Sequence, residues 1–495
     1  MYRNIISIVA LTLVFADSVN AQFSILHSFT GSTTDGRYAQ GSLITDGIYL
    51  YGMTPRGGLV DSGTIFQIKF DGSDYTLLSS FNGTTEGGGP LGSLIKDGVN
   101  LYGMNQWGGT NGDGIIFRHG LDNNIITPLH SFMGKPPGGD APVASLVKDG
   151  TFLYGMTQRG GISDYGTIFR INLDGSNFAV LHHFTKDTDG ARPQGSLITD
   201  GTFLYGMTQF SGPNSSIGTV FRIRLNGNDF AVLHNFTGAT NDGASPYGSL
   251  LINGTFLYGM TGRGGTNYTG NTFATDAGTI FRVGLDGSNF SLLHSFTGTT
   301  NDGAKPFGSL ITNGMYLYGL TEFGGTTNSG TIFKFGLNGS GFTVLHSLTG
   351  TTNDGSIPLG SLIIHEKYLF GLTPGGGSNG EGTIFKLGEA TLPIDFSDLT
   401  LALKDLTILP AYPNPFNPST TIRYGLSADS KVIIQIYNIT GNLISTLESN
   451  NQTQGWHSVQ WNGTNSKNEQ VPAGIYFGKV TSYDYTKTTK LMLLK

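Results

Sequence analysis

The sequence predicts an all-β protein: a seven-bladed β-propeller of four-stranded blades, followed by a small Ig-like β-sandwich. The first observation behind this prediction is a motif, Leu-Tyr-Gly-Met or a close variant, that recurs along the chain. Its ring positions are Tyr51, Tyr102, Tyr154, Tyr205, Tyr258, Tyr318 and Phe370. They are separated by 51, 52, 51, 53, 60 and 52 residues. A period near fifty indicates one supersecondary unit repeated in series, each unit burying its apolar face on its neighbours.

The second observation is the composition. Glycine makes up 76 of the 495 residues, and charged residues make up 13 %, where about 25 % is typical. Together with periodic aromatic and aliphatic residues, this composition is typical of short strands joined by tight turns. The net charge of −6 argues against a nucleic-acid partner, which needs a basic patch, and makes an acidic polymer a poor ligand. Cysteine is absent, which excludes disulfides and thiolate chemistry.

The third observation is that each repeat contains four strand-like segments. Those of one unit are Gly248–Leu251, Phe256–Met260, Gly278–Arg282 and Phe290–Phe296. Asn-Gly and Asp-Gly pairs stand between them, and these pairs favour the positive φ values of two-residue hairpins. Four antiparallel strands in each unit is the pattern of a propeller blade.

The number of copies of each strand predicts how the ring closes. The Gly-Thr-Ile-Phe strand, or a near variant, occurs seven times and ends for the last time at Phe385. The Leu-His-x-Phe strand also occurs seven times, but its first copy, Leu26–Phe29, precedes any blade. We therefore expect the N-terminal strand to complete the last blade, which removes an exposed sheet edge. The interval of 60 predicts a protruding loop at 267–275 in the fifth blade.

These units resemble the tandem GloVer repeats of exported bacterial proteins. The resemblance rests on the strings Gly-Ser-Leu-Ile, Leu-Tyr-Gly-Met-Thr, Gly-Gly and Gly-Thr-Ile-Phe, which recur in this order across residues 23–387. It implies a surface or secreted repeat protein, and it transfers no catalytic residue.

The N-terminus has the pattern of a secretory signal peptide. Arg3 supplies a positive charge, Ile5–Phe15 is an apolar run, and Val19-Asn20-Ala21 favours cleavage after Ala21. The apolar run of 11 residues is too short to span a membrane, so we expect no transmembrane segment after cleavage. The predicted domains are a signal peptide at 1–21, the propeller at 22–388, a linker at 389–409 and the sandwich at 410–495.

The C-terminal module opens with Pro-Asn-Pro-Phe-Asn-Pro at 413–418 and continues in short alternating strands, which predicts a β-sandwich. It resembles the type A sorting domain of the type IX secretion system through this opening, Tyr437–Ile444, Pro472–Tyr476 and the basic-flanked end. The resemblance implies the type IX secretion machinery as a partner, in a Bacteroidota-like bacterium, and a product that is secreted or held on the outer cell surface. It assigns the sorting signal to Pro413, Asn414, Pro415, Phe416, Asn417, Pro418, Gly441, Gly474, Tyr476 and Lys495. The alternative is an Ig-like binding domain without a sorting role.

A histidine occupies one repeat position of the outer strands: His27, His130, His182, His234, His294 and His346, with Ser79 as the exception. Strand alternation places His182 on one apolar face with Phe178, Val180 and Phe184. The histidines belong to different blades, so no two of them can bind one metal ion at the Zn–N distance of about 2.0–2.1 Å. We interpret them as packing residues that make a structural hydrogen bond.

Acidic turns recur between the blades, as in Asp187–Gly190 and Asn241–Gly243. Calcium takes about 6–8 oxygen ligands, whereas each turn offers one or two carboxylates and Asp-Gly is an ordinary turn pair. We therefore expect no metal and no cofactor, and we retain only Asp187 and Asp189 as weak calcium candidates.

One variable residue precedes each paired-glycine turn, and we expect these loops to share a propeller face with the acidic turns. Arginine and aromatic residues are enriched at binding hot spots, and aromatic rings also stack on sugars. The ligand-face candidates are Arg56, Trp107, Arg159, Phe210, Arg263 and Phe323, while Gly375 has no side chain to offer. The alternative is that these side chains cover apolar blade edges or vary freely.

No nucleophile with an adjacent base, pair of carboxylates at repeat-breaking positions or phosphate loop stands out in the sequence. We therefore expect a non-enzymatic, exported propeller that binds a glycan or a protein. The alternative is a secreted carbohydrate-active enzyme, a hydrolase or a lyase, whose site would need residues that depart from the repeat near the central channel. A further alternative is a structural surface layer.

Overall fold

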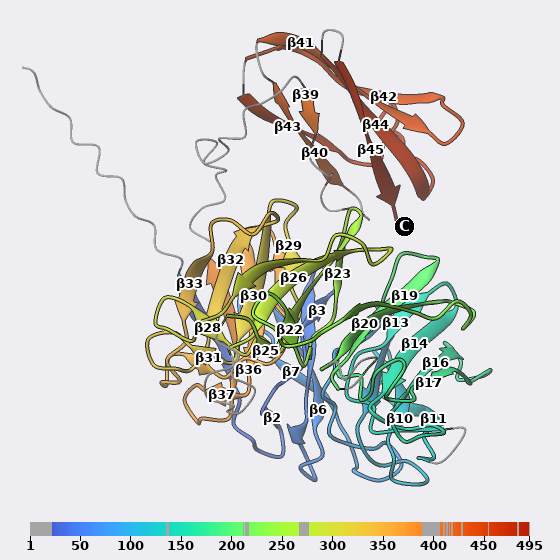
Figure 1. Cartoon of the computed structure of the whole chain (residues 1–495), viewed down its shortest axis with the longest axis vertical. Coiled ribbons are helices and arrows are strands. Elements are labelled where there is room, and N and C mark those ends of the chain that lie inside the picture. Colours follow the sequence, from blue (N-terminus) through green and yellow to red (C-terminus); the bar gives the residue numbers. More distant parts are fainter. Residues whose placement is uncertain are drawn as a thin grey trace, which may run out of the picture.

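The computed structural model describes residues 22–134, 138–210, 212, 217–266, 277–388 and most of 406–494. Every helix or strand assigned in this part of the chain is a β-strand (Figure 1), which confirms the predicted all-β class. No helix of the described residues has the length and hydropathy needed to cross a membrane. The expected signal peptide and the expected loop at 267–275 lie outside these residues.

Seven four-stranded antiparallel sheets occupy the described part of residues 23–388, and we call them blades 1 to 7. Blade 1 consists of β3 (Ile44–Thr45), β4 (Tyr49–Thr54), β6 (Thr64–Lys69) and β7 (Thr76–Ser80). Blade 2 consists of β8 (Ile95–Asp97), β9 (Asn100–Asn105), β10 (Ile115–Gly120) and β11 (Ile126–Ser131). Blade 3 consists of β13 (Val147–Asp149), β14 (Phe152–Thr157), β16 (Thr167–Asn172) and β17 (Ala179–His183). Blade 4 consists of β18 (Ile198–Thr199), β19 (Phe203–Thr208), β20 (Thr219–Arg224) and β21 (Ala231–Asn235).

The remaining sheets repeat this order. Blade 5 consists of β23 (Leu251–Asn253), β24 (Phe256–Thr261), β26 (Thr279–Gly284) and β27 (Ser291–Ser295). Blade 6 consists of β29 (Ile311–Thr312), β30 (Tyr316–Thr321), β32 (Thr331–Gly336) and β33 (Thr343–Ser347). Blade 7 consists of β35 (Ile363–His365), β36 (Tyr368–Thr373), β38 (Thr383–Gly388) and the N-terminal strand β1 (Phe23–Ser28). β1 pairs antiparallel with β38, from Phe23 opposite Leu387 to Ser28 opposite Thr383. The four-stranded, propeller-like blades and the place of the N-terminal strand therefore agree with the prediction.

Hydrogen bonds between serines link neighbouring sheets at their first strands. In each blade the serine of the Gly-Ser-Leu string, or of Ala-Ser-Leu in blade 3, donates its backbone N–H to the Oγ of the next blade's serine, over 2.7–2.9 Å. The links run through Ser42, Ser93, Ser145, Ser196, Ser249, Ser309 and Ser361, and Ser361 donates back to Ser42. The last sheet is thus bonded to the first.

The repeat motif divides its side chains between two neighbouring cores. In blade 3, Leu153 lies in the core shared with blade 2, whereas Tyr154 and Met156 lie in the core shared with blade 4. The glycine between Tyr154 and Met156 makes room for the next strand, because a Cβ on Gly155 would lie 2.5 Å from the ring of Phe169. The motif therefore serves packing, as a buried strand with a period of two requires.

Each outer strand contains a β-bulge at the leucine that precedes the histidine position. In blade 3, Ile168 pairs with His182 and Phe169 pairs with Val180, so Leu181 is the extra residue. A bulge interrupts strand alternation, and residues paired across strands lie on one face. The expectation that His182 and Val180 share a face is therefore wrong, because a bulge leaves no signal in simple alternation.

The histidines pack between blades, as predicted, and their partner is the acidic turn. The ring of His182 stacks on Phe230 of blade 4 with centroids 4.0 Å apart, and its Nε2 lies 2.8 Å from Oδ2 of Asp189. Four further pairs have this geometry: His27–Asp35, His234–Asp242, His294–Asp302 and His346–Asp354.

The sequence analysis treated the histidine and the acidic turn as separate features, although one repeat changes both of them. Where the outer strand carries Ser79, the turn carries Glu86 in place of aspartate. Where Gly138 replaces the aspartate, His130 loses this partner, and burial lowers the pKa of His130 to about 4. The joint change to Ser79 and Glu86 is the signal that could have indicated this contact, whereas His130 is retained without its partner.

The C-terminal part is a β-sandwich of two sheets with its own core. The strand order of one sheet is β39 (Leu406–Ile408), β40 (Thr420–Leu426) and β43 (Gly455–Trp461). The strand order of the other is β42 (Leu443–Gln452), β41 (Ser430–Asn438), β44 (Gly474–Ser482) and β45 (Tyr485–Leu493). Leu406 is only 3 % exposed and belongs to this core. The sandwich thus begins inside the segment predicted as a linker, because a strand of three residues is too short to show a period.

Candidate functional site

At one end of each blade, the acidic turn and the paired-glycine loop pair with each other, as expected. In blade 1, β2 (Gly36–Arg37) pairs with β5 (Arg56–Gly57), which places Arg37 opposite Arg56. The same ladder joins β12 (Gly139–Asp140) to β15 (Arg159–Gly160), β22 (Gly243–Ala244) to β25 (Arg263–Gly264), β28 (Gly303–Ala304) to β31 (Phe323–Gly324), and β34 (Gly355–Ser356) to β37 (Gly375–Gly376). Single bridges at Gly88–Trp107 and Ala191–Phe210 replace it in blades 2 and 4. All six ligand-face candidates therefore occupy equivalent positions at this loop end.

A backbone position next to this ladder is held in the left-handed region. Tyr38, Ala141, Arg192, Ser245, Lys305 and Ile357 all have φ between 52° and 59°. Residues other than glycine rarely adopt this conformation. Here it directs each backbone N–H to a carbonyl of the preceding blade, as from Tyr38 to Glu381 at 2.9 Å. The docking of one blade on the next thus fixes where these side chains emerge.

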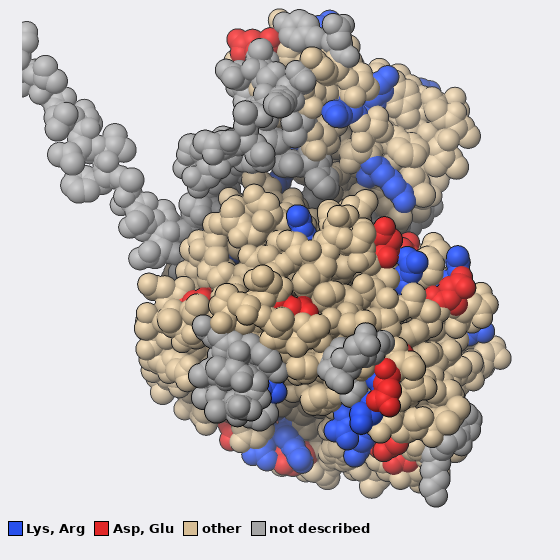
Figure 2. Space-filling view, viewed as in Figure 1, with Lys and Arg blue, Asp and Glu red and all other residues tan. Residues whose placement is uncertain are grey.

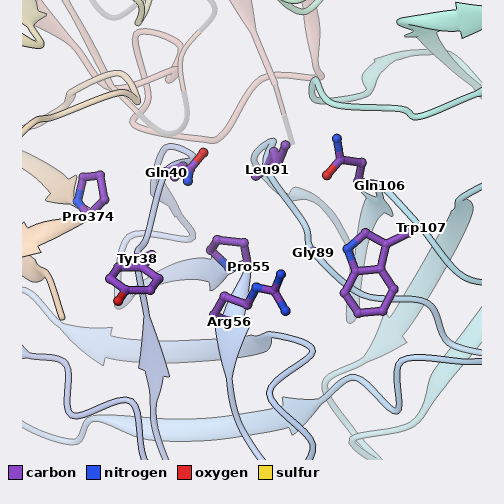
Figure 3. Close-up of a pocket in the computed structure, with 9 residues that line it drawn as sticks. All are labelled: Tyr38, Gln40, Pro55, Arg56, Gly89, Leu91, Gln106, Trp107 and Pro374. Atoms are coloured by element: carbon purple, nitrogen blue, oxygen red, sulfur yellow. The ribbon is translucent and has the colours of Figure 1, made fainter.

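A pocket of about 350 Å³ lies at this loop end, where blades 7, 1 and 2 meet. Its lining residues are Tyr38, Gln40, Pro55, Arg56, Gly89, Leu91, Gln106, Trp107 and Pro374 (Figure 3). Two of the predicted ligand-face residues, Arg56 and Trp107, are among them. The other four, Arg159, Phe210, Arg263 and Phe323, belong to blades 3 to 6 and do not line this pocket.

Trp107 forms one wall of the pocket and lies against a run of glycines. A Cβ on Gly88 would lie 2.3 Å from Cη2 of the indole, and a Cβ on Gly89 would lie 2.4 Å from its Nε1. Blade 2 carries Gly87-Gly88-Gly89 where blade 5 carries Gly243-Ala244-Ser245. Side chains at these positions would displace the ring, so the glycine run and Trp107 belong together.

Arg56 is exposed, and its guanidinium extends toward Trp107 (Figure 3). The carboxylate of Asp61 accepts hydrogen bonds from Arg37, whose Nε and Nη2 lie 3.1 Å and 2.7 Å from its two oxygens, and from the N–H of Gly57. Arg56 reaches only the backbone oxygen of Asp61, over 3.5 Å. At the equivalent position of blade 3, by contrast, Nε of Arg159 lies 3.2 Å from Oδ2 of Asp140.

A second group of residues that depart from the repeat lies at the same loop end in blades 4 to 6. The rings of Tyr247 and Phe307 meet edge to face at 4.3 Å, and Gln194 donates to Gln209 over 2.9 Å. Burial raises the pKa of the Tyr247 hydroxyl and of the Glu322 carboxyl, the latter against the opposing charge of Lys305. This group offers a proton donor and acceptor that the sequence analysis did not single out.

The weak calcium candidates lie in the acidic turn between blades 3 and 4. The Asp189 carboxylate accepts hydrogen bonds from His182 Nε2, from the backbone N–H of Thr185 and from its Oγ1, so both oxygens are occupied. Asp187 is exposed. Among the described residues, no group of three or more histidine, aspartate or glutamate side chains is placed to hold a metal ion.

Of the predicted sorting residues, Asn414, Phe416, Gly441, Gly474 and Tyr476 are described, whereas Pro413, Pro415, Asn417, Pro418 and Lys495 lie outside the described residues. Asn414 accepts from the N–H of Met492 and donates to the carbonyl of Lys490, each over 2.7 Å. Phe416 is 1 % exposed and contacts Trp461, as does Tyr476. The opening of the module is therefore bonded to its last strand.

The charges of the protein are sparse and mixed. Figure 2 shows basic and acidic side chains beside one another on a mostly uncharged surface. This distribution agrees with the net charge of −6.

Among solved structures, the chain is similar to the extracellular domain of a proposed one-component system, BT4673, from B. thetaiotaomicron, with 10 % identity, a TM-score of 0.47, and coverage of 96 % of this chain and 58 % of that one. It is also similar to a PL25 ulvan lyase, with 10 % identity, a TM-score of 0.45, and coverage of 73 % and 96 %. A puromycin-hydrolyzing peptidase from Mycobacterium tuberculosis matches with 14 % identity, a TM-score of 0.44, and coverage of 78 % and 57 %. None of them assigns an activity to this chain, and no curated protein matches it.

Two family models match the sequence. The FlgD Ig-like domain matches residues 417–485, within the sandwich. The Gloeobacter/Verrucomicrobia repeat matches residues 12–135, 97–273 and 272–401, and so spans most of the chain in tandem copies. The chain therefore belongs to the Gloeobacter/Verrucomicrobia repeat family.

Proposed function

We propose that the protein is an exported, non-enzymatic binding module that holds a glycan in the pocket between blades 7, 1 and 2. We also infer that its seven sheets form one closed seven-bladed propeller. The serine hydrogen bonds that return from Ser361 to Ser42 support this closure, as does the pairing of β1 with β38. A closed ring of sheets gives the loops a rigid base, and binding sites concentrate on such loops.

The observation that carries the proposed function is the chemistry of the pocket wall. Trp107 and Tyr38 offer aromatic faces for a sugar ring, and Gln40 and Gln106 offer amides for its hydroxyl groups. The volume of about 350 Å³ lies at the lower end of the range for small-molecule sites, about 300–1,000 Å³. A concave site of this size suits a short saccharide better than the broad surface that a protein partner needs.

The Trp107→Ala variant tests this proposal. We expect it to weaken binding of the recognised glycan by about 30-fold, because loss of a hot-spot aromatic costs about 2 kcal/mol or more. Glycan-array screening of residues 22–388 identifies the ligand, and calorimetry on the wild type and the variant measures the loss. Phe210→Ala is the matched control, since Phe210 is 40 % exposed at the equivalent position of blade 4 and lies outside the pocket. Equal affinities for the wild type and Trp107→Ala would place the binding face elsewhere.

The alternative, a secreted carbohydrate-active enzyme, has one observation in its favour. Glu322 and Tyr247 depart from the repeat at the loop end, and burial raises the pKa of both groups, as acid–base catalysis often requires. The same binding experiment addresses this alternative. A binding module returns the saccharide unchanged, whereas a hydrolase or lyase shortens it during incubation.

The route of export is the second part of the proposal. We infer that the signal peptide at 1–21 directs the chain across the inner membrane and that the C-terminal sandwich directs it through the type IX secretion machinery. The basis is the Pro-Asn-Pro-Phe-Asn-Pro opening and the strings that resemble a type A sorting domain. Hydrogen bonds join Asn414 and Phe416 to Met492 and Leu494. They support the proposal that the opening and the C-terminal end of the module act together as one folded signal.

Deletion of residues 406–495 tests this route. The deletion starts at β39 because that strand pairs within the sandwich. We expect the truncated protein to stay in the periplasm, with circular dichroism showing that its β-structure is retained. Cell fractionation and surface proteolysis measure its location against the full chain. Surface display of the truncated protein at the normal level would contradict the sorting role.

A further inference from the structure

Arg56 is the one charged side chain among the nine that line the pocket. Its guanidinium is exposed, and its one hydrogen bond in the described structure runs to the backbone oxygen of Asp61. A guanidinium keeps its positive charge at any physiological pH. The pocket therefore presents, between an aromatic wall and two amides, a cation whose one hydrogen bond in the described structure is to a backbone oxygen.

The ladder of blade 1 explains why this charge is left over. Arg56 pairs across the strands with a second arginine, Arg37, whereas Arg159 in blade 3 pairs with Asp140. Arg37 forms two hydrogen bonds to the carboxylate of Asp61, which belongs to the loop that carries Arg56. In blade 3, by contrast, the Asp140 carboxylate neutralises Arg159 over 3.2 Å. The same repeat position thus carries an arginine that is bonded to a carboxylate in blade 3, and an arginine that is bonded only to a backbone oxygen at the pocket.

We propose that the saccharide bound in this pocket carries an anionic substituent, a carboxylate or a sulfate, which Arg56 binds; this inference rests on the proposed glycan-binding function. The planar guanidinium matches two oxygens of such a group at once. The neighbouring amides of Gln40 and Gln106 bind sugar hydroxyls without competing for the charge.

The surroundings of Arg56 limit the ligand to an isolated anionic group. The whole chain carries a net charge of −6, which repels a long polyanion. One acidic sugar in a largely neutral glycan avoids this repulsion, because charges further than about 8–10 Å away are screened at physiological salt. The pocket, at about 350 Å³, has room for a short segment only.

The test compares pairs of oligosaccharides that differ only in charge, on the full chain. One pair is a neutral oligosaccharide that carries a single galacturonate and the methyl ester of the same compound; a second is a galactose oligosaccharide with a single sulfate and its desulfated form; uronate and sulfate glycans on an array extend the set. We expect the charged member of a recognised pair to bind about 10-fold more tightly than the neutral one. Arg56→Gln should remove this preference, so that the charged and neutral members of the pair bind with equal affinity.

Arg159→Gln is the matched control, because it removes an arginine from the same repeat position outside the pocket. It should keep the wild-type preference. Equal affinity for charged and neutral members, with both lost in Trp107→Ala, would overturn the anionic ligand and leave the glycan pocket standing. A preference that survives Arg56→Gln would also overturn it. Failure of every saccharide to bind would overturn the proposed function itself. The pair that is recognised distinguishes a carboxylate from a sulfate.

Discussion

Replacement of Phe29 by alanine is expected to lower the free energy of unfolding by about 3–5 kcal/mol. Phe29 follows the N-terminal strand, yet it is fully buried with residues of blades 1 and 7, including Phe66 and Phe370. Its backbone N–H donates to Gly382 over 3.0 Å, at the far end of the repeat region. Loss of a buried phenylalanine removes apolar contacts and leaves a cavity, which together give this magnitude. Urea unfolding followed by circular dichroism measures the change.

Phe184→Ala is the control, because Phe184 holds the same repeat position between two blades that are adjacent in sequence. Phe184 is also fully buried, and its N–H donates to Gly166 over 3.1 Å. If the N-terminal strand closes the ring, the two variants lose stability to the same extent. If that strand were detached, Phe29 would be exposed, and its replacement would change the unfolding free energy by less than about 0.5 kcal/mol.

Most of the fold could be predicted from the sequence, because each strand motif occurs in several copies and a strand that is ambiguous in one repeat is clear in another. Copies of Leu-Tyr-Gly-Met and Gly-Thr-Ile-Phe mark the two central strands of each blade, and the displaced copy at Leu26–Phe29 indicates where the chain ends meet. The bulge at Leu181 and its equivalents escaped prediction, since an extra residue changes the facing of side chains without changing composition. The short strand β39 escaped it too, because Leu406–Ile408 has no repeat partner for comparison.

The site was less predictable than the fold. Arg56 and Trp107 stood out because they vary where the repeat is otherwise constant. Tyr38 and Gln40 did not, although they line the same pocket. Their place depends on a left-handed backbone at Tyr38 and on the docking of blade 1 against blade 7, and neither is visible along one repeat. Tyr38 and Gln40 could have been found by comparing the residues that follow the acidic turn in all seven repeats.

Replacement of Asp242 by asparagine is expected to lower the free energy of unfolding by about 3 kcal/mol. Asp242 is 8 % exposed, and its carboxylate accepts hydrogen bonds from His234 Nε2, from the N–H and Oγ1 of Thr237, and from the N–H of Gly243. Asparagine has one oxygen, and its NH₂ would face donors in place of an acceptor. The loss of stability arises because buried donors around residue 242 are left without an acceptor. Urea unfolding at pH 7 measures this loss as a change in the free energy of unfolding.

Asp286→Asn is the control, because Asp286 is an exposed turn residue of the next blade whose replacement should change stability by less than about 0.5 kcal/mol.

A pH series separates the charge of Asp242 from its shape. Burial by itself would raise the pKa of Asp242, but the hydrogen bonds from His234 and Thr237 outweigh it and hold the pKa below the ordinary value of 3.8. A carboxyl whose pKa is lower in the folded state stabilises the fold above its ordinary pKa, and this contribution is lost as the pH falls through the folded pKa. The difference between wild type and Asp242→Asn should therefore shrink as the pH falls below 3.8. If the difference in unfolding free energy stayed constant down to pH 3, the charge of Asp242 would not contribute to it. The hydrogen bond between His234 and Asp242 would then stabilise the fold through its geometry and not through the charge of the carboxylate.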